Sequence, residues 1–191
     1  DKPFPRIVVP TDGSHLSESA AHAAAALARR VGVPLTLFGV TYSGDDRDDL
    51  SNTLNELITT LRRDLVVDVI VDVLGAAVTV DAYVAEAILE EADVDGAVVC
   101  IASHGRGGLG AALLGSINED ELHKSRRPVL VVGPRFEPRP WREDGTVVAC
   151  VDGSPYSEQA LPVAAEWSAT FGSQLWLVHV AAPTDLVAPG D

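Results

Sequence analysis

The sequence contains few of the residues that build disulfide-bonded, zinc-binding and membrane-spanning proteins. Its two cysteines, Cys100 and Cys150, lack the CxxC spacing of a zinc site, and aromatic residues make up only 5% of its 191 positions. No apolar run approaches the roughly 20 residues of a membrane helix, and no segment resembles a secretory signal. We therefore expect a protein of the reducing cytoplasm, with no structural zinc, no disulfide framework and no membrane partner.

Basic residues are also scarce, and methionine is absent. The chain has 14 Lys and Arg against 28 Asp and Glu, which gives a formal net charge of -14. Such a surface repels polyphosphate polymers, so we expect no binding to nucleic acid, although small anions can still bind where backbone dipoles oppose the global field. The lack of an initiator methionine indicates a trimmed N-terminus or a part of a longer gene product.

The hydrophobic pattern of the first two thirds alternates between strand and helix. Ser14 is a plausible N-cap for the first helix, and Gly32 follows its end. The expected strands are residues 6–10, 34–41, 66–74, 96–102 and 128–133, and the expected helices are 14–31, 50–65, 80–92 and 116–127, with a polar loop at 42–49. This order predicts an α/β fold, a doubly wound open parallel five-stranded sheet of the Rossmann-like type with strand order 3-2-1-4-5.

The opening of the chain returns near its end. Residues 6–41 align without a gap onto residues 146–181, at a constant offset of 140. The positions that match are Asp12, Gly13, Ser14, Ser17, Glu18, Gly32, Leu35, Leu37 and Val40 with Asp152, Gly153, Ser154, Ser157, Glu158, Gly172, Leu175, Leu177 and Val180. A tandem repeat explains this match. We expect a complete nucleotide-binding domain at 1–134, a linker at 135–145 and a partial β-α-β copy of the same fold at 146–191, too small to close a core.

A candidate site lies where the strand order reverses, between strands 1 and 4. The segments that leave these strands are "PTDGS" and "ASHGRGGLGAALLGS". Gly105, Gly107, Gly108 and Gly110 allow consecutive backbone N–H groups to converge on an anion, and the expected helix at Ser116 adds its free N–H groups. Phosphate fits this loop. Asp12 would be repelled by phosphate, so we expect it to accept hydrogen bonds from a ribose hydroxyl or an adenine amino group.

Structural interpretations remain open for each of these residues. Ser116 and Glu119 form a capping box, and Gly115 can be a tight helix entry. Asp12 can be a favourable acid near a helix start. His104 can be an ordinary loop residue, Arg106 a solvated charge with a phosphate contact, and Val40 a core residue. Four histidines, His15, His22, His123 and His179, show no metal-ligand spacing, so no metal site is expected in the protein itself.

The segments "IVVPTDGS", "LTLFGV" and "ASHGRGGLGAALLGS" before "RRPVLVV" resemble the universal stress protein family in its tandem-domain form. The resemblance covers residues 5–133 as a complete domain and 145–182 as the opening of a second. The glycine pattern of the family's nucleotide-binding branch falls on Ala102, Gly105, Gly115 and Ser116, and only Ala102 departs from it. With the residues that the resemblance adds, the candidate binding residues are Pro10, Thr11, Asp12, Val40, Ala102, Ser103, His104, Gly105, Arg106, Gly115, Ser116 and Ile117.

The expected function is that of an ATP-binding regulatory protein, a sensor or switch in the stress response that binds ATP with Mg²⁺ and has no catalytic residues. The alternative is a dimeric stress adaptor that binds no nucleotide. A dehydrogenase is disfavoured because the glycines follow strand 4 and not strand 1. A P-loop ATPase is disfavoured because "GRGGLGAALLGS" has no Gly-Lys-Ser/Thr ending, so hydrolysis is at most a slow side activity. The family resemblance and the apolar edge strand "PVLVV" also predict a homo-oligomer joined at that strand.

Overall fold

The computed structural model forms two compact units, an N-terminal unit, Lys2–Pro140, and a C-terminal unit, Trp141–Asp191. The structure describes residues 2–41, 43–62, 65–73, 81–103, 125, 127–133, 135–137 and 145–179, with the side chains of 81–83 excepted. In the N-terminal unit the elements are β1 (Ile7–Pro10), α1 (His15–Val31), β2 (Leu35–Thr41), α2 (Asp45–Leu61), β3 (Val67–Val73), α3 (Asp81–Asp93), β4 (Val98–Ala102) and β5 (Val129–Val132).

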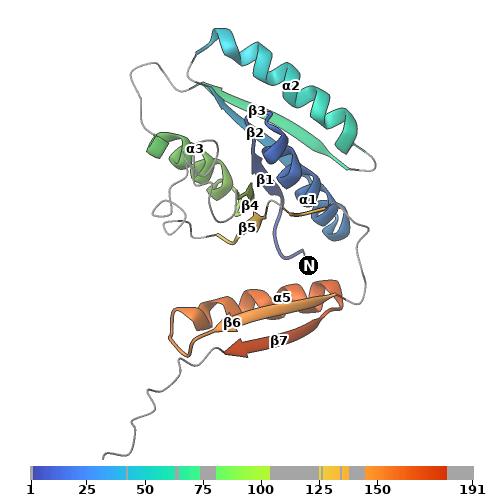
Figure 1. Ribbon diagram of the computed structural model, residues 1–191, viewed down its shortest axis with the longest axis vertical. Helices are drawn as coiled ribbons and strands as arrows, with labels where there is room; N and C mark the ends of the chain where they lie inside the picture. Colours follow the sequence, from blue (N-terminus) through green and yellow to red (C-terminus); the bar gives the residue numbers. More distant parts are fainter. Residues whose placement is uncertain are drawn as a thin grey trace, which may run out of the picture. The chain divides into compact units, whose positions relative to one another are not determined.

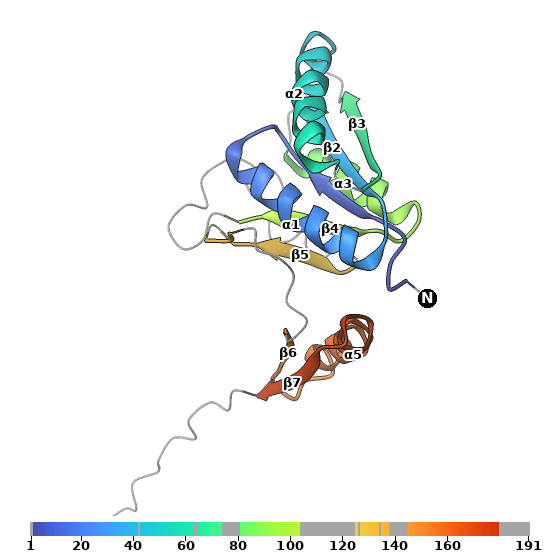
Figure 2. The ribbon, with the colours of Figure 1, turned by 90° about the vertical axis from the view of Figure 1, so that its right-hand side faces the viewer.

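The five described strands of this unit form one parallel sheet in the order β3-β2-β1-β4-β5, which confirms the predicted fold class (Figure 1). Helices α1 and α2 cover one face of the sheet and α3 covers the other (Figure 2). Both arrangements follow from right-handed crossovers, because the chain moves outward from β1 to β3 and then returns past β1 to β4. The point of return places the carboxyl ends of β1 and β4 next to each other.

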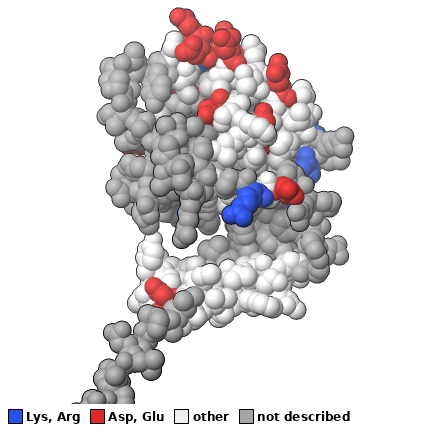
Figure 3. All heavy atoms as spheres, in the orientation of Figure 1, with Lys and Arg blue, Asp and Glu red and all other residues white. Residues whose placement is uncertain are grey.

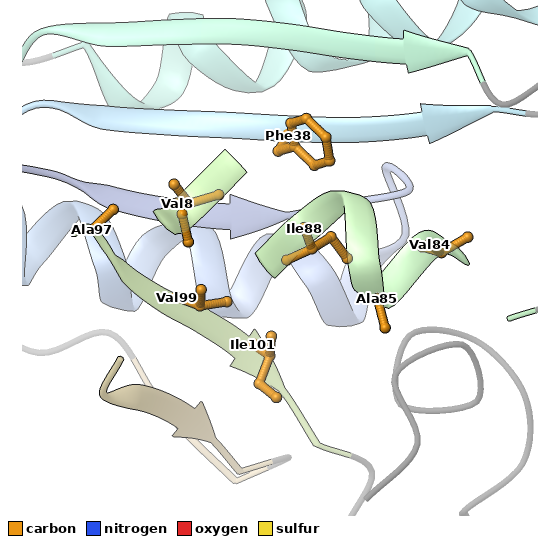
Figure 4. Close-up of a cluster of buried hydrophobic side chains, with 9 residues drawn as sticks. Val8, Phe38, Val84, Ala85, Ile88, Ala97, Val99 and Ile101 are labelled. Atoms are coloured by element: carbon orange, nitrogen blue, oxygen red, sulfur yellow. The ribbon is translucent and has the colours of Figure 1, made fainter. Parts of the chain in front are cut away.

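The core on the α3 face consists of side chains from three strands and one helix. Val8 of β1, Phe38 of β2 and Val99 of β4 pack against Ile88 of α3, and all four are buried (Figure 4). Val40 is partly buried and packs against the same cluster. Because side chains alternate along a strand, the neighbours of these residues point to the α1 face, where Cys100 donates from Sγ to the backbone oxygen of Ala20 at 3.6 Å.

Helix α1 begins and ends as its sequence predicts. Ser14 has extended backbone angles and its side chain accepts a hydrogen bond from the Ser17 N–H, so it is the N-cap. Gly32 adopts a φ of 74° and donates from its N–H to the Ala28 oxygen, which ends the helix in the left-handed conformation that glycine favours. The alanines between them are mostly buried, and their small side chains let the helix lie close to the sheet.

Helix α2 differs from the expectation at both ends. Residues 45–49, which we expected in a polar loop, form its first turns, because Asp45, Asp46 and Asp48 interact favourably with the positive end of the helix dipole. Leu65, expected in the apolar stripe, lies beyond the helix end at Leu61. The chain has to leave the helix there because the Val66 oxygen already accepts from the Leu35 N–H at 3.0 Å, beside β3. Acidic side chains gather over this helix (Figure 3).

The C-terminal unit contains β6 (Thr146–Val151), a 3-10 turn η1 (Ser157–Gln159), α5 (Ala160–Phe171) and β7 (Gln174–His179). Its two strands are parallel, and one sheet face carries Val148, Trp176 and Val178, of which the first two are 51% and 58% exposed. Their counterparts at the 140-residue offset, Val8, Thr36 and Phe38, are all buried in the N-terminal unit. Ala149 and Phe171 are the buried hydrophobic residues among 145–179.

Candidate functional site

The strand order reverses between β1 and β4. These strands are paired at Ile7 and Val8, with partners Val98 and Val99, and the register extends no further. Beyond this point each strand bonds to its other neighbour: the Thr11 N–H donates to the Phe38 oxygen at 2.9 Å, and the Ser103 N–H donates to the Val132 oxygen at 2.8 Å. Pro10 has no N–H to bridge the gap. The two strands therefore part at their carboxyl ends, where doubly wound sheets bind their ligands.

Asp12 is held at this edge by the turn that joins β1 to α1. Gly13 adopts a φ of 76°, a conformation that L side chains rarely adopt, and this brings the Ser14 N–H within 2.9 Å of Asp12 Oδ1. Ser17 Oγ lies 2.9 Å from the same oxygen. Burial alone would raise the pKa of Asp12, but the hydrogen bonds from Ser14 and Ser17 outweigh it and hold the pKa below its ordinary value. Asp12 is therefore ionised at neutral pH.

Two buried hydroxyl groups lie behind this carboxylate. Thr11 Oγ1 and Ser17 Oγ are 2.8 Å apart, and the two residues are 3% and 0% exposed. The sequence predicted Thr11 as a candidate binding residue but not Ser17. A signal for Ser17 was present in the sequence, because the spacing D-G-S-x-x-S occurs twice, at Asp12 and at Asp152.

The other described candidates lie near the carboxyl ends of β1, β2 and β4 and differ in exposure. Pro10 is buried at the end of β1, and Val40 is half-buried against the α3 core, as its core interpretation predicts. Ala102 is the last residue of β4 and is buried, so its methyl group is enclosed by the protein itself. Ser103 follows it and is half-buried. The structure thus brings Asp12 and the backbone after β4 to the same edge of the sheet.

The remaining candidates lie outside the described residues. They are His104, Gly105, Arg106, Gly115, Ser116 and Ile117, together with the helix expected to begin at Ser116. The phosphate half of the predicted site consequently rests on its glycine pattern.

The C-terminal unit contains the same turn. Gly153 has a φ of 83°, the Ser154 N–H donates to Asp152 Oδ1 at 2.9 Å, and the Ser157 N–H donates to Ser154 Oγ at 3.1 Å. Hydrogen bonds from Ser154 and Ser157 lower the pKa of the fully exposed Asp152. The same turn thus forms in both units, so its geometry follows from its local sequence.

Metal-binding groups and reactive thiols are the other kinds of site to consider among the described residues. No group of three His, Cys, Asp or Glu side chains there could hold a metal ion. Burial raises the pKa of the Cys100 thiol to about 12, so it is not a thiolate at neutral pH. Within the part of the chain that is described, no helix combines the length and apolarity needed to cross a membrane.

The sequence matches the model of the universal stress protein family over residues 3–133. The chain belongs to the universal stress protein family. A curated universal stress protein of Mycobacterium tuberculosis is 32% identical over 90 residues, which is 47% of this chain and 30% of that protein. The same values hold for one from Mycobacterium bovis. The aligned part of this universal stress protein thus spans 30% of the length of these curated relatives.

Solved universal stress proteins share its fold. One from Archaeoglobus fulgidus has a TM-score of 0.52 at 23% identity, over 68% of this chain and 98% of that chain. A complex of the Archaeoglobus fulgidus protein with dAMP has a TM-score of 0.52 at 20% identity, over 68% and 97%. Another, from Archaeoglobus fulgidus DSM 4304, reaches 0.65 at 20% identity and covers 95% of this chain and 69% of that chain. At these identities the likeness concerns the fold.

Proposed function

We propose that this universal stress protein is an ATP-binding regulatory protein, a sensor or switch of the stress response and not a catalyst. The observation that carries the proposal is the ionised Asp12 carboxylate where β1 and β4 part, with its Oδ1 held by the Ser14 N–H and the Ser17 hydroxyl. An acceptor in this place suits the donors of a nucleoside, a ribose hydroxyl or an adenine amino group. The solved relative in complex with dAMP supports an adenine nucleotide as the ligand class.

The two ends of the ligand would meet different chemistry. Asp12 and Val40 would receive the adenosine, and the phosphates, with Mg²⁺, would lie on the glycine-rich segment that runs from Gly105 to Ile117. Two features support this orientation of the ligand. The Asp12 carboxylate repels phosphate, and the backbone N–H groups of a glycine-rich segment can turn toward it. Ala102, the one departure from the family's glycine pattern, is buried at the end of β4, which favours a site that its methyl group leaves open.

A regulatory role is favoured over catalysis by the sequence of the glycine-rich segment. It has no lysine before Ser116 to contact the terminal phosphates, which a P-loop enzyme needs. We propose that hydrolysis, where it occurs, is slow and incidental to binding.

The second candidate is a dimeric adaptor that acts without nucleotide. The exposed edge strand β5, with Val131 51% exposed, favours it, because such an edge offers unpaired backbone groups to a partner. An acid extract of the purified protein, separated by ion exchange beside nucleotide standards, distinguishes the two candidates: co-purified adenine nucleotide supports the switch.

Thermal unfolding with and without Mg-ATP tests the proposal in four proteins. At a hundred times its dissociation constant, ATP should stabilise the wild type by about 2.7 kcal/mol. Asp12→Ala should weaken ATP about tenfold to a hundredfold and reduce this gain to about 0.4–1.4 kcal/mol at the same concentration. Gly115→Val should lose most of the gain, because a β-branched residue narrows the phosphate turn.

Asp152→Ala is the matched control, because Asp152 sits in the same local turn of the C-terminal unit, and the glycine-rich segment of residues 105–117 belongs to the N-terminal unit. It should keep the full gain. Equal ligand shifts in all four proteins, or no shift in the wild type, would contradict the nucleotide proposal and favour the adaptor.

A further inference from the structure

Asp12 Oδ1 accepts two hydrogen bonds, one from a backbone N–H and one from a side-chain hydroxyl. The Ser14 N–H belongs to the turn itself, whereas Ser17 reaches back from the first turn of α1, five residues later, with its Oγ at 2.9 Å. We propose that Ser17, supported by Thr11, is a positioning residue that fixes the Asp12 carboxylate for the nucleoside part of the ligand. This inference rests on the proposed nucleotide-binding function.

The direction of the Ser17 hydroxyl follows from its surroundings. Its Oγ is 2.9 Å from both Asp12 Oδ1 and the Ser14 backbone oxygen, and it has a single proton to donate. The Ser14 oxygen already accepts the helical hydrogen bond from the Glu18 N–H at 3.0 Å. A carboxylate is the stronger acceptor of the two. The Ser17 proton therefore goes to Asp12.

Thr11 completes a relay of hydroxyl groups. Its Oγ1 accepts from the Gly13 N–H at 3.2 Å, which leaves its proton free to donate to Ser17 Oγ at 2.8 Å. Both hydroxyls are buried, so water does not compete for these bonds. Thr11 thus holds the Ser17 oxygen in place, and Ser17 in turn holds the exposed carboxylate of Asp12.

The relay determines what Asp12 can recognise. Oδ1 accepts from both the Ser14 N–H and the Ser17 hydroxyl, and we infer that Oδ2 is the oxygen that meets the ligand. Since the carboxylate is ionised, Oδ2 can only accept, which suits a hydroxyl or amino group of a nucleoside and opposes a phosphate. Ser17 should therefore contribute to the affinity for the adenosine part of ATP and not to the affinity for its phosphates.

The C-terminal unit supplies a natural comparison. Ser157 occupies the equivalent place and its N–H donates to Ser154 Oγ, as the Ser17 N–H does to Ser14 Oγ. Val151 stands where the N-terminal unit has Thr11, so no threonine hydroxyl supports Ser157. Its Oγ instead accepts from the Asp152 N–H at 3.2 Å. Ser157→Ala is thus a control that removes a serine from the same local turn outside the proposed site.

Calorimetric binding of three probes tests the proposal: ATP, adenosine and inorganic tripolyphosphate. Ser17→Ala should weaken ATP and adenosine by the same factor, about tenfold, which is the loss expected for one hydrogen bond to a charged group. It should leave tripolyphosphate unchanged, and Ser157→Ala should leave all three probes unchanged. Unaltered adenosine affinity in Ser17→Ala, or an equal loss of all three probes, overturns the proposal.

A carbon-detected NMR titration of the Asp12 carboxyl provides a second readout that does not need the ligand. Ser17→Ala should raise the pKa of Asp12 toward its ordinary value, Thr11→Val should raise it less, and Thr11→Ser should restore it. These Thr11 variants decide the question if Ser17→Ala folds poorly. A wild type that binds neither ATP nor adenosine refutes the proposed function itself. An unchanged Asp12 pKa in both Ser17→Ala and Thr11→Val refutes the positioning role.

Discussion

Arg6 and Asp95 are joined by a 2.8 Å hydrogen bond from the guanidinium Nε to Oδ2, although 89 positions separate them in the sequence. The same guanidinium forms an ion pair with Glu91 Oε1 at 2.9 Å and donates to the Glu91 backbone oxygen at 2.8 Å. It also donates to Thr36 Oγ1 at 3.1 Å. Burial alone would lower the pKa of Arg6, but Asp95 and Glu91 outweigh it and raise the pKa. Arg6 thus ties the end of α3 to the start of β1, opposite the candidate site.

Replacing Arg6 should destabilise the N-terminal unit. Arg6→Met keeps much of the side-chain volume but leaves Glu91 and Asp95 without their cation, and we expect a loss of about 1.5–3 kcal/mol in the free energy of unfolding. Arg127→Met is the control, because its 3.4 Å pair with Asp93 is exposed on both sides and should contribute less than about 1 kcal/mol. Urea unfolding measures both; equal losses would show that the Arg6 network contributes no more than a surface ion pair.

A side chain at Gly13 should be costly for two separable reasons. The residue has a φ of 76°, and an added Cβ would lie 2.7 Å from Cγ2 of Thr53 on α2. We expect Gly13→Ala to destabilise the protein by about 2–3 kcal/mol, part from backbone strain and part from this clash. Adding Thr53→Ser removes the opposing methyl group and should recover the second part. A double-mutant cycle with no coupling between the two positions would contradict the contact.

Asp12 should make stability depend on acid pH. Its pKa in the folded state lies below the ordinary value of 3.8, so its contribution is fully present above that value and is lost as the pH falls through the folded pKa. Asp12→Asn lacks this titration. Without ligand, the stability difference between wild type and Asp12→Asn should shrink between pH 6 and pH 3, by less than about 1 kcal/mol because Asp12 is exposed. Thermal unfolding along a pH series measures it; a difference that stays constant argues against the bonds on Oδ1.

The β5 edge should govern association. We expect light scattering to give a mass above the 20.1 kDa of one chain at micromolar concentrations. Val131→Lys should shift the mass toward the monomer, because a charge on an exposed edge strand opposes pairing. Val66→Lys is the matched control, since Val66 is an exposed valine beside β3, at the other edge of the same sheet. A monomeric wild type, or an equal effect of both lysines, would contradict pairing through β5.

The sequence predicted most of the fold because its signals are local. Ser14 and Gly32 mark the ends of α1 by hydrogen bonds to residues within a single turn. The strands can be predicted from their apolar composition. The ends of α2 were wrong for opposite reasons. Its start at Asp45 was missed because a run of acidic residues is equally typical of a polar loop and of the first turn of a helix. Its end at Leu61 depends on the hydrogen bond between Val66 and Leu35, which forms only in the folded sheet.

The candidate site was less accessible to sequence reasoning. The position of Asp12 at the carboxyl end of β1 follows from strand order. Its Oδ1 serves the turn, as a structural role requires, whereas its role toward a ligand stays a prediction. The support from Ser17 and Thr11 depends on distances between side chains of a strand end and a helix, which no spacing rule specifies. For Gly105 to Ile117 the sequence pattern remains the basis of the prediction.

The sparsely buried C-terminal unit has a consequence for the motions of the protein. With Ala149 and Phe171 as the buried hydrophobic residues among 145–179, little apolar surface opposes the separation of β6 from β7. Amide protons in the core strands of a domain exchange with solvent only when the whole domain opens, whereas weakly packed strands exchange through local openings. Amides of β1 and β4 should therefore retain their protons in D₂O long after those of β6 and β7 have been replaced. The same turn motif thus lies in an N-terminal unit that opens rarely and in a C-terminal unit that opens often.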